Sequence, residues 1–212
     1  MGIYGHIDRH RHHERPAMNV VESAVRQLGR WRESLRTIGD TWGTSEEERS
    51  AAYPCDRVMP DADQWLFRGI DVDAPAALTF RWLCQLRVAP YSYDWIDNLG
   101  KQSPRELTPG LEDVQVGQRC MTMFTIADVE PGESITVHAR SVFGEVGGTY
   151  RVVPVGDERS RIVVKLGMTY PRGLHGELMR DVLPAGDLFM MRKQLQTLAS
   201  LAERDAGLAV SS

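Results

Sequence analysis

The segment YSYDWIDNL places aromatic and acidic side chains close together in the chain. Tyr91 and Tyr93 supply phenols beside the carboxylate of Asp94, a combination that can orient the polar group of a ligand. In a desolvated site, Asp94 could act as a base. The structural alternative is an aromatic wall of Tyr91, Tyr93 and Trp95 at a cavity mouth, with Asp94 or Asp97 capping a short helix. Asp94 and Tyr93 are therefore the first candidate proton-transfer residues.

A histidine in the middle of a predicted strand is the third candidate. His138 lies between Val137 and Ala139, and an imidazole that faces a cavity can transfer protons near neutral pH. Ile135, Val137 and Ala139 form the apolar face of this strand, because alternate residues point the same way. The pattern thus favours His138 on the opposite, polar face, and a catalytic role remains the alternative.

Arginines could supply positive charge to such a site. Arg68, Arg81, Arg140 and Arg151 could each neutralise an enolate or a carboxylate. Most arginines of a soluble protein solvate its surface, so the sequence singles out none of the four.

The sequence predicts neither a metal site nor a cofactor. Cys55, Cys84 and Cys120 are far apart and form no CxxC pair, which argues against a disulfide framework and against a zinc ribbon. The histidine-rich residues 1–17 are expected to be a disordered tail, without the fixed geometry that a metal needs. GxGxxG, GxxxxGK[ST], GxSxG and HExxH are absent, so a cofactor-free pocket is expected.

Alternating apolar and polar residues predict an antiparallel sheet in the middle of the chain. Strands are expected at residues 65–72, 114–121, 122–130, 133–142, 147–155 and 160–170. Pro131-Gly132 and Gly156-Asp157 fit tight turns between successive strands. A helix is expected after Pro75, since Leu78, Trp82, Leu83 and Leu86 share one helical face; Pro90 ends it.

A long helix is predicted to close the domain. It extends to about residue 204, and its apolar stripe steps by three and four residues through Leu188, Met191, Leu195, Leu198 and Ala202. Pro184 predicts a kink or a break near residues 183–187. A sheet followed by one long apolar-striped helix indicates a hollow domain that can hold an apolar small molecule.

The domain plan has four parts. Residues 1–17 form the tail, 18–64 a helix with an irregular connector, 65–205 the main domain, and 206–212 a second tail. Apolar residues at helical spacing predict a helix over 18–38, which packs on the main domain, forms a homodimer contact or lies on a membrane surface. Ser45 followed by Glu48 is a capping-box pattern for a short helix in the connector.

Several local segments resemble one protein superfamily. They are WGT with the acidic EEE behind it, the YSYDWIDNL segment, DVQVG and the YPRGL turn. With the element order, they make residues 40–204 similar to the START-like (SRPBCC, Bet v 1-like) superfamily, in its bacterial polyketide cyclase/dehydrase-type subgroup. The resemblance implies an α+β helix-grip fold: a curved antiparallel sheet wrapped around a long C-terminal helix, here with an N-terminal helical extension. It implies a cavity, and it assigns no reaction.

Two functions are expected for such a cavity. The first is binding of a hydrophobic or aromatic small molecule between the sheet and the C-terminal helix. The alternative is a cofactor-independent aromatase/cyclase or dehydratase that uses Asp94 and Tyr93, with His138 as a weaker candidate, for proton transfer. The residues expected to contact the ligand are Trp82, Tyr91, Trp95, Met123, Ile135, Val137, Val164, Met168, Leu188, Met191 and Leu195. Met121 and Met190 are further candidates for the cavity wall.

Charge and hydropathy indicate which kinds of partner the protein binds. The net charge of −4 over 212 residues gives no argument for nucleic acid or for an anionic membrane. No run of 18 apolar residues is present, so no integral membrane segment is expected. The absence of a signal core and the unpaired cysteines favour a cytoplasmic protein whose partner is a small molecule.

Overall fold

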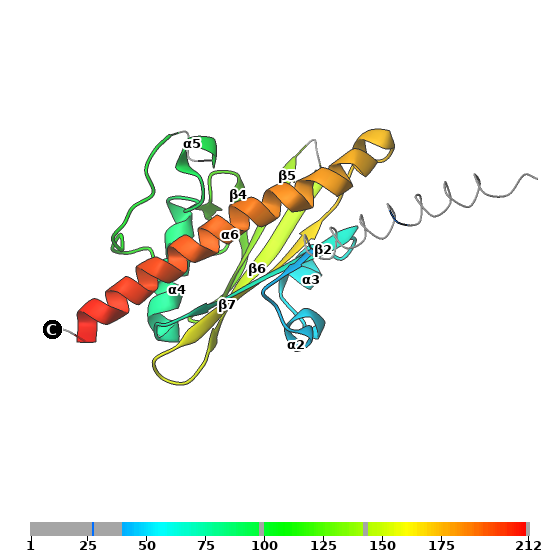
Figure 1. Cartoon of the computed structure of the whole chain (residues 1–212). Coiled ribbons are helices and arrows are strands. Elements are labelled where there is room, and N and C mark those ends of the chain that lie inside the picture. Colours follow the sequence, from blue (N-terminus) through cyan, green and yellow to red (C-terminus); the bar gives the residue numbers. More distant parts are fainter. Residues whose placement is uncertain (1–26, 28–39, 98–99, 142–143, 211–212) are drawn as a thin grey trace, which may run out of the picture. The chain divides into compact units, whose positions relative to one another are not determined.

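A twisted sheet of seven strands forms the centre of the part of the chain that the structure describes (Figure 1). The computed structural model describes residues 27, 40–97, 100–141 and 144–210. Internal contacts divide the chain into residues 1–36 and residues 37–212, and every element below belongs to the second unit. Apart from Gln27, the predicted helix over 18–38, its dimer contact and the tail 1–17 lie outside the described residues.

The strands form an open, almost wholly antiparallel sheet. They are β1 (Thr41–Trp42), β2 (Gln64–Val72), β3 (Arg119–Cys120), β4 (Phe124–Glu130), β5 (Ser134–Ser141), β6 (Gly144–Pro154) and β7 (Ser160–Met168). Their order across the sheet is β1-β2-β7-β6-β5-β4-β3. Only β1 and β2 run parallel; the other neighbours are antiparallel. Among the described residues β1 and β3 are the two edges, so the sheet does not close into a barrel.

Glycines make the predicted turns possible. Gly132, between β4 and β5, has φ +80°, and Gly156, between β6 and β7, has φ +75°. This left-handed region costs glycine little and other residues more. The turns let each strand return beside its predecessor without a crossover helix.

The predicted strand over residues 114–121 is wrong except at its end. Only β3, two residues long, pairs there with β4. Gly117 has φ +90°, and Met121 and Thr122 also have positive φ, +46° and +65°. An extended strand needs negative φ, so these residues force the chain into turns. The alternating side chains that suggested a strand lie in a loop instead.

Helices cover both faces of the sheet (Figure 1). They are α2 (Glu46–Ser50), α3 (Cys55–Val58), α4 (Ala76–Cys84), the 3-10 helix η1 (Gln85–Arg87), α5 (Asp94–Asp97) and α6 (Leu174–Val210). α4 and α6 pack on one face of the sheet, called here the inner face, and α3 packs on the other, the outer face. This α+β arrangement, with one long C-terminal helix against an antiparallel sheet, confirms the predicted helix-grip fold.

α6 is longer and more regular than predicted. It is one helix from Leu174 to Val210, so the helix does not break at Pro184 and its end near residue 204 is wrong, while a kink at Pro184 stays a prediction. Proline removes one backbone donor, but its fixed φ suits a helix. Of the predicted stripe, Met191, Leu195, Leu198 and Ala202 are buried. They join the main core, which also contains inward residues of β2, β5, β6 and β7 and the apolar face of α4.

The connector over residues 40–64 is more ordered than predicted, since it holds β1, α2 and α3. The predicted capping box at Ser45 is confirmed. The Ser45 hydroxyl accepts a hydrogen bond from the Glu48 amide at 3.2 Å, and the Glu48 carboxylate accepts one from the Ser45 amide at 2.8 Å. These bonds satisfy backbone donors that the start of a helix leaves free.

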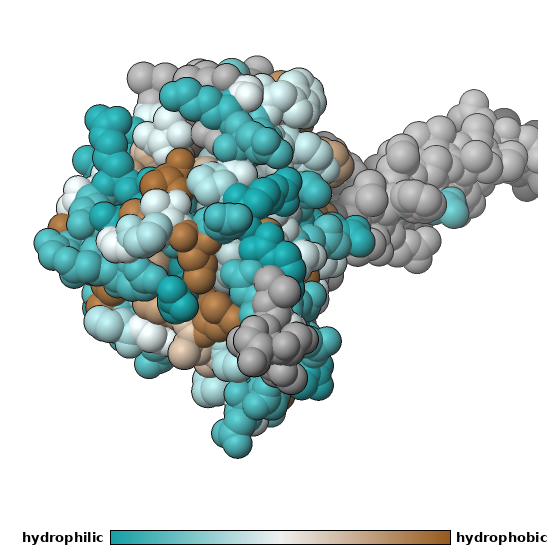
Figure 2. Space-filling view, turned by 90° about the vertical axis from the view of Figure 1, so that its left-hand side faces the viewer, coloured by the Kyte–Doolittle hydropathy of each residue, from teal (hydrophilic) through white to brown (hydrophobic). Residues whose placement is uncertain are grey.

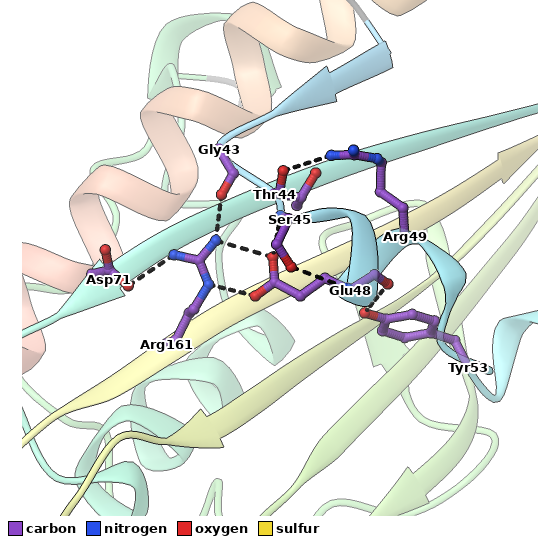
Figure 3. A network of polar contacts seen from close by, with 8 residues as sticks. All are labelled: Gly43, Thr44, Ser45, Glu48, Arg49, Tyr53, Asp71 and Arg161. Atoms are coloured by element: carbon purple, nitrogen blue, oxygen red, sulfur yellow. Dashed lines mark hydrogen bonds and ion pairs between the residues drawn. The ribbon is translucent and has the colours of Figure 1, made fainter.

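An arginine of β7 ties this connector to the sheet (Figure 3). Arg161 donates through Nε to Glu48 at 2.5 Å and through Nη1 to Asp71 on β2 at 2.8 Å. It also donates to the carbonyl oxygen of Gly43, next to β1. Charge-assisted bonds of this kind are stronger than neutral ones. One guanidinium thus joins the end of β1, α2, β2 and β7.

Candidate functional site

Two adjoining pockets lie between α6 and the inner face of the sheet. The hairpin pocket, of about 330 Å³, is lined by Met123, Phe124, Ser141, Gly144, Glu145, Val146, Met168, Thr169, Tyr170, Leu183 and Asp187. The core pocket, of about 230 Å³, is lined by Pro90, Ser92, Met121, Met123, Phe124, Val137, Val146, Tyr150, Leu166, Asp187, Met190, Met191 and Gln194. The two pockets share four residues: Met123, Phe124, Val146 and Asp187.

One face of α6 lines these pockets. Leu183, Asp187, Met190, Met191 and Gln194 contribute to one or both. They recur at spacings of three and four residues and therefore lie above one another on the helix. This face overlaps the predicted apolar stripe at Met191 but is turned away from Leu195, which packs in the core. The helix thus uses one side for the core and an adjacent side for the cavity.

Methionine dominates the cavity wall. Met121, Met123, Met168, Met190 and Met191 all line the pockets, and they are the five methionines that the sequence put forward for this position. Met123 is 65% exposed and stands at the rim. The unbranched, polarisable thioether adapts to irregular shapes and makes favourable contacts with aromatic rings. Such a wall suits a flat apolar guest.

A buried ion pair stands at the boundary between the two pockets. Arg68 on β2 is fully buried and donates through Nη2 to Asp187 Oδ2 at 2.9 Å. Its Nη1 donates to the backbone oxygens of Asp40, at 3.1 Å, and Phe67, at 2.9 Å. Arg68 Nε is buried without a hydrogen-bond partner among the described residues. Arg68 is not a lining residue of either pocket; Asp187 lines both.

Burial sets the ionisation of Asp187. The side chain is 17% exposed, and loss of solvent raises its pKa from 3.8 to about 6, although the charge and the hydrogen bond of Arg68 act in the opposite direction. The carboxyl group therefore changes its charge within reach of neutral pH. A carboxyl group of this kind can exchange protons with a bound molecule.

Two buried polar side chains of the core pocket, Tyr150 and Gln194, bind each other. The Tyr150 hydroxyl donates to Gln194 Oε1 at 2.9 Å, and Gln194 Nε2 donates to the carbonyl oxygen of Pro90 at 2.6 Å. Burial raises the pKa of Tyr150 well above its usual range, so the phenol stays protonated. Its donor is already used by Gln194, and the pair fixes the position of α6 relative to the segment before α5.

Asp94, the predicted catalytic aspartate, holds the loop that follows α5. Asp94 begins α5 and accepts hydrogen bonds from the Ser103 amide at 2.9 Å and the Ser103 hydroxyl at 2.5 Å. Tyr93 stacks on Phe189 of α6, with ring centroids 4.7 Å apart. Neither Asp94 nor Tyr93 lines the two pockets. Asp94 thus bonds Ser103 of the following loop. Tyr91 is buried and Trp95 is 76% exposed, and neither lines a pocket, so the predicted aromatic wall is not formed.

His138 also lies away from the cavity lining. Its Nε2 is 3.2 Å from Glu145 Oε2, and Arg140 Nε is 2.7 Å from Glu145 Oε1. Hydrogen bonds from Arg140 and then from His138 lower the pKa of Glu145. The side chain of His138 is 26% exposed. Its neighbour Val137 lines the core pocket, so alternation along β5 turns the histidine to the outer face.

The residues predicted to contact a ligand fall into two groups. Met123, Val137, Met168 and Met191 line the pockets. The others do not: Trp82, Tyr91, Ile135, Val164 and Leu195 are buried in the core, Leu188 is half-buried and Trp95 is 76% exposed. Period and hydrophobicity identify the inner face, but they do not distinguish a side chain that fills the core from one that borders a hollow.

Sequence reasoning missed Asp187 and gave Arg68 no special role. A signal for both was present. Asp187 is an acid on the same helical face as Met191, and Arg68 shares its strand face with Leu66. Burying an unpaired charge on an apolar face costs free energy. Each of these two residues therefore predicts a partner of opposite charge on the facing element.

Metal and membrane sites find no support in the part of the chain that the structure describes. No group of three or more His, Cys, Asp or Glu residues is placed to hold a metal ion there. The described helices include none that is both long and apolar enough to cross a bilayer. Cys55, Cys84 and Cys120 are buried free thiols, and burial raises the pKa of each.

Comparison with known proteins places the chain among solved structures of low similarity. No family model and no curated protein match it. The Zhui aromatase/cyclase from Streptomyces sp. R1128 aligns with TM-score 0.46 and 18% identity, over 66% of this chain and 94% of that one. A hypothetical protein from Helicobacter pylori gives 0.45 and 10%, over 72% and 96%. A norcoclaurine synthase point mutant from Thalictrum gives 0.42 and 12%, over 67% and 95%.

These values carry no argument about function, since all identities are below 25% and all TM-scores below 0.5. The fold assignment rests on the chain itself. Its element order and its sheet order β1-β2-β7-β6-β5-β4-β3, closed on one face by α6, are those of a helix-grip fold.

Proposed function

We propose that the protein binds a small, mainly apolar molecule between α6 and the inner face of the sheet. One observation carries this proposal: two adjoining pockets with mostly apolar walls meet at Met123, Phe124, Val146 and Asp187. Pockets of known small-molecule sites occupy roughly 300–1,000 Å³ and combine apolar walls with a few polar groups. The volumes of about 330 and 230 Å³ suit a guest of two or three rings.

Apolar burial would supply most of the affinity. Each Å² of apolar surface removed from water contributes roughly 25 cal/mol, and the cost of ordering the guest reduces the sum. The methionine wall can adjust to the guest with little strain. Asp187 would then fix the orientation of the guest.

The test is a fluorescence titration with N-phenyl-1-naphthylamine, a neutral apolar dye. The wild-type protein should bind it saturably. Val146→Trp places a larger side chain at the boundary of the pockets and should weaken binding by about tenfold or more, because the site is then overfilled. Val155→Trp is the matched control, since Val155 is exposed in the β6–β7 turn. Equal affinities for all three proteins would place the dye elsewhere and refute the proposal.

The second candidate function is cofactor-independent proton transfer, as in an aromatase/cyclase or dehydratase. Asp187 supports it, because a carboxyl group with a pKa of about 6 in a mostly apolar pocket is suited to general acid–base chemistry. In the form expected from the sequence, Asp94 and Tyr93 would transfer the proton instead. The contacts of Asp94 with Ser103 and of Tyr93 with Phe189 give that version less support.

Hydrogen–deuterium exchange at the methyl group of 2-acetylnaphthalene, followed by NMR in D₂O, separates these versions. If Asp187 is the base, Asp187→Asn should reduce the protein-dependent exchange by about 100-fold, and Asp94→Asn should leave it unchanged. The reverse result would assign the role to Asp94. Exchange no faster than in buffer would remove the enzymatic function and leave the binding function intact.

A further inference from the structure

The two oxygens of Asp187 have different surroundings. Oδ2 accepts the hydrogen bond of Arg68 at 2.9 Å. Oδ1 accepts no hydrogen bond from any described residue, and it is not among the buried polar atoms without a partner. Because Asp187 lines both pockets, this oxygen is an acceptor that a guest can reach. We propose, on the basis of the binding function above, that the guest is an uncharged aromatic alcohol whose hydroxyl donates to Asp187 Oδ1.

Charge balance selects an uncharged guest. Arg68 and Asp187 form a pair without net charge. The other ionisable carboxylate of the cavity wall, Glu145 in the hairpin pocket, is paired with Arg140 and His138. No lining residue therefore offers a surplus charge to an ionic guest. A cation or an anion would lose its hydration without compensation, which is costly in an apolar site.

Tyr150 and Gln194, the buried polar side chains of the core pocket besides the ion pair, already have partners. Tyr150 and Gln194 are bonded to each other, and Gln194 is bonded to Pro90. The donors of both groups are already used, so a guest could only donate to their oxygens, which are neutral acceptors. A hydroxyl at Asp187 Oδ1 adds one without breaking any, and a hydrogen bond to a charged acceptor is stronger than one to a neutral acceptor.

The walls on either side of Asp187 favour aromatic rings. Met168 lies on the hairpin side, Met121 and Met191 lie on the core side, and Phe124 is common to both pockets. Thioethers and a phenyl ring make their best contacts with aromatic faces and edges. Because Asp187 stands at the boundary, the hydroxyl would lie there and the ring system would extend into one pocket or both.

Three naphthalenes of nearly equal size test the chemical class. At pH 7, 2-naphthol is a neutral donor, 2-methoxynaphthalene lacks the donor, and 2-naphthylmethylamine is a cation. Binding is measured by isothermal titration calorimetry on the full chain. We expect 2-naphthol to bind about tenfold or more tightly than 2-methoxynaphthalene, as one hydrogen bond to a charged group allows, and also more tightly than the amine. A tighter amine would overturn the assignment of an uncharged guest.

A pair of variants tests the role of Asp187. Arg68→Met with Asp187→Leu replaces both charges by apolar groups of similar size, a change that buried ion pairs often tolerate. In this double variant the preference for 2-naphthol over 2-methoxynaphthalene should fall to less than about twofold. Glu177→Gln, which alters an exposed carboxylate of α6 that lines neither pocket, should retain the full preference.

The outcomes separate this inference from the binding function. If both neutral naphthalenes bind and the double variant keeps the preference, Asp187 is not the acceptor, while the cavity remains a binding site. If no naphthalene binds to the wild-type protein, both proposals fail.

Discussion

At the scale of single residues, the candidate site depends on Asp187 and its partner Arg68. The pair joins α6 to β2 inside an otherwise apolar region. The sequence predicted the apolar frame around it correctly, because a strand and a helix each repeat with a fixed period. It did not predict the pair, since the two residues are far apart in the chain and only the fold brings them within 2.9 Å. Asp94 shows the converse, a conspicuous acid that bonds its own loop.

The raised pKa of Asp187 predicts a pH-dependent contribution to stability. The folded value is about 6 and the ordinary value is 3.8, so the folded state holds this proton more tightly. The contribution is fully present below the unfolded pKa and is lost as pH rises through the folded pKa. A shift of this size corresponds to about 3 kcal/mol. Arg68 is the charged group that faces Asp187; Tyr150 and Tyr170 remain neutral in this range, because burial raises the pKa of both.

Urea denaturation of the wild-type protein and of Asp187→Asn at several pH values measures this contribution. The free energy of unfolding of the wild type minus that of the variant should decrease by about 2 kcal/mol between pH 4 and pH 7, because part of the contribution is already lost at pH 4. All other carboxyl groups titrate in both proteins and cancel in the difference. A difference that stays constant or increases with pH would show that Asp187 has no raised pKa in the folded state.

At the scale of elements, an ion pair joins a helix to a strand on each face of the sheet. On the inner face it is Arg68 with Asp187, and on the outer face it is Arg161 with Glu48 and Asp71 (Figure 3). The sequence predicted the capping box at the start of α2. It did not predict that the Glu48 carboxylate also binds Arg161 of β7. The capping bonds are local in the chain, whereas Arg161 comes close to Glu48 only in the folded protein.

Arg161 should therefore matter more than an ordinary surface arginine. Its side chain is 19% exposed, and its loss would leave Glu48 without its cationic partner. We expect Arg161→Ala to lower the free energy of unfolding by about 2 kcal/mol. Arg159→Ala is the control: Arg159 pairs with Asp73 in an exposed position, where a salt bridge contributes about 0–1 kcal/mol. Similar losses for the two variants, measured by urea denaturation, would contradict the proposed connection.

α6 continues through Pro184, although the local preference of proline predicts that a helix ends there. Proline predicts a break in a helix because it lacks a donor and crowds the preceding turn. Here the residues after Pro184 pack on the core, and Asp187 is bonded to Arg68. Tertiary contacts of this kind stabilise a helix more than the intrinsic preference of its residues does. At Gly117, Met121 and Thr122 the local conformation has the larger effect. Their positive φ angles interrupt the strand that the alternating apolar pattern predicted.

At the scale of the whole domain, the fold gathers its apolar side chains toward the inner face and its cavity. The surface drawn in Figure 2 is largely hydrophilic, and its apolar patches are small and separated by polar side chains. The sequence predicted this layout, and a hydrophobic cavity between sheet and helix stays a prediction that the binding experiments test. The sequence did not fix the cavity's lining, because the same apolar residue can fill a core or border a hollow, depending on neighbours that meet only in the fold.

A crystal structure of the protein with N-phenyl-1-naphthylamine would show where the guest binds. We expect its rings to lie between α6 and the inner face of the sheet, in contact with Met123, Phe124, Val146 and Met191. Side chains that fill this space, with the dye bound elsewhere or not at all, would contradict this expectation.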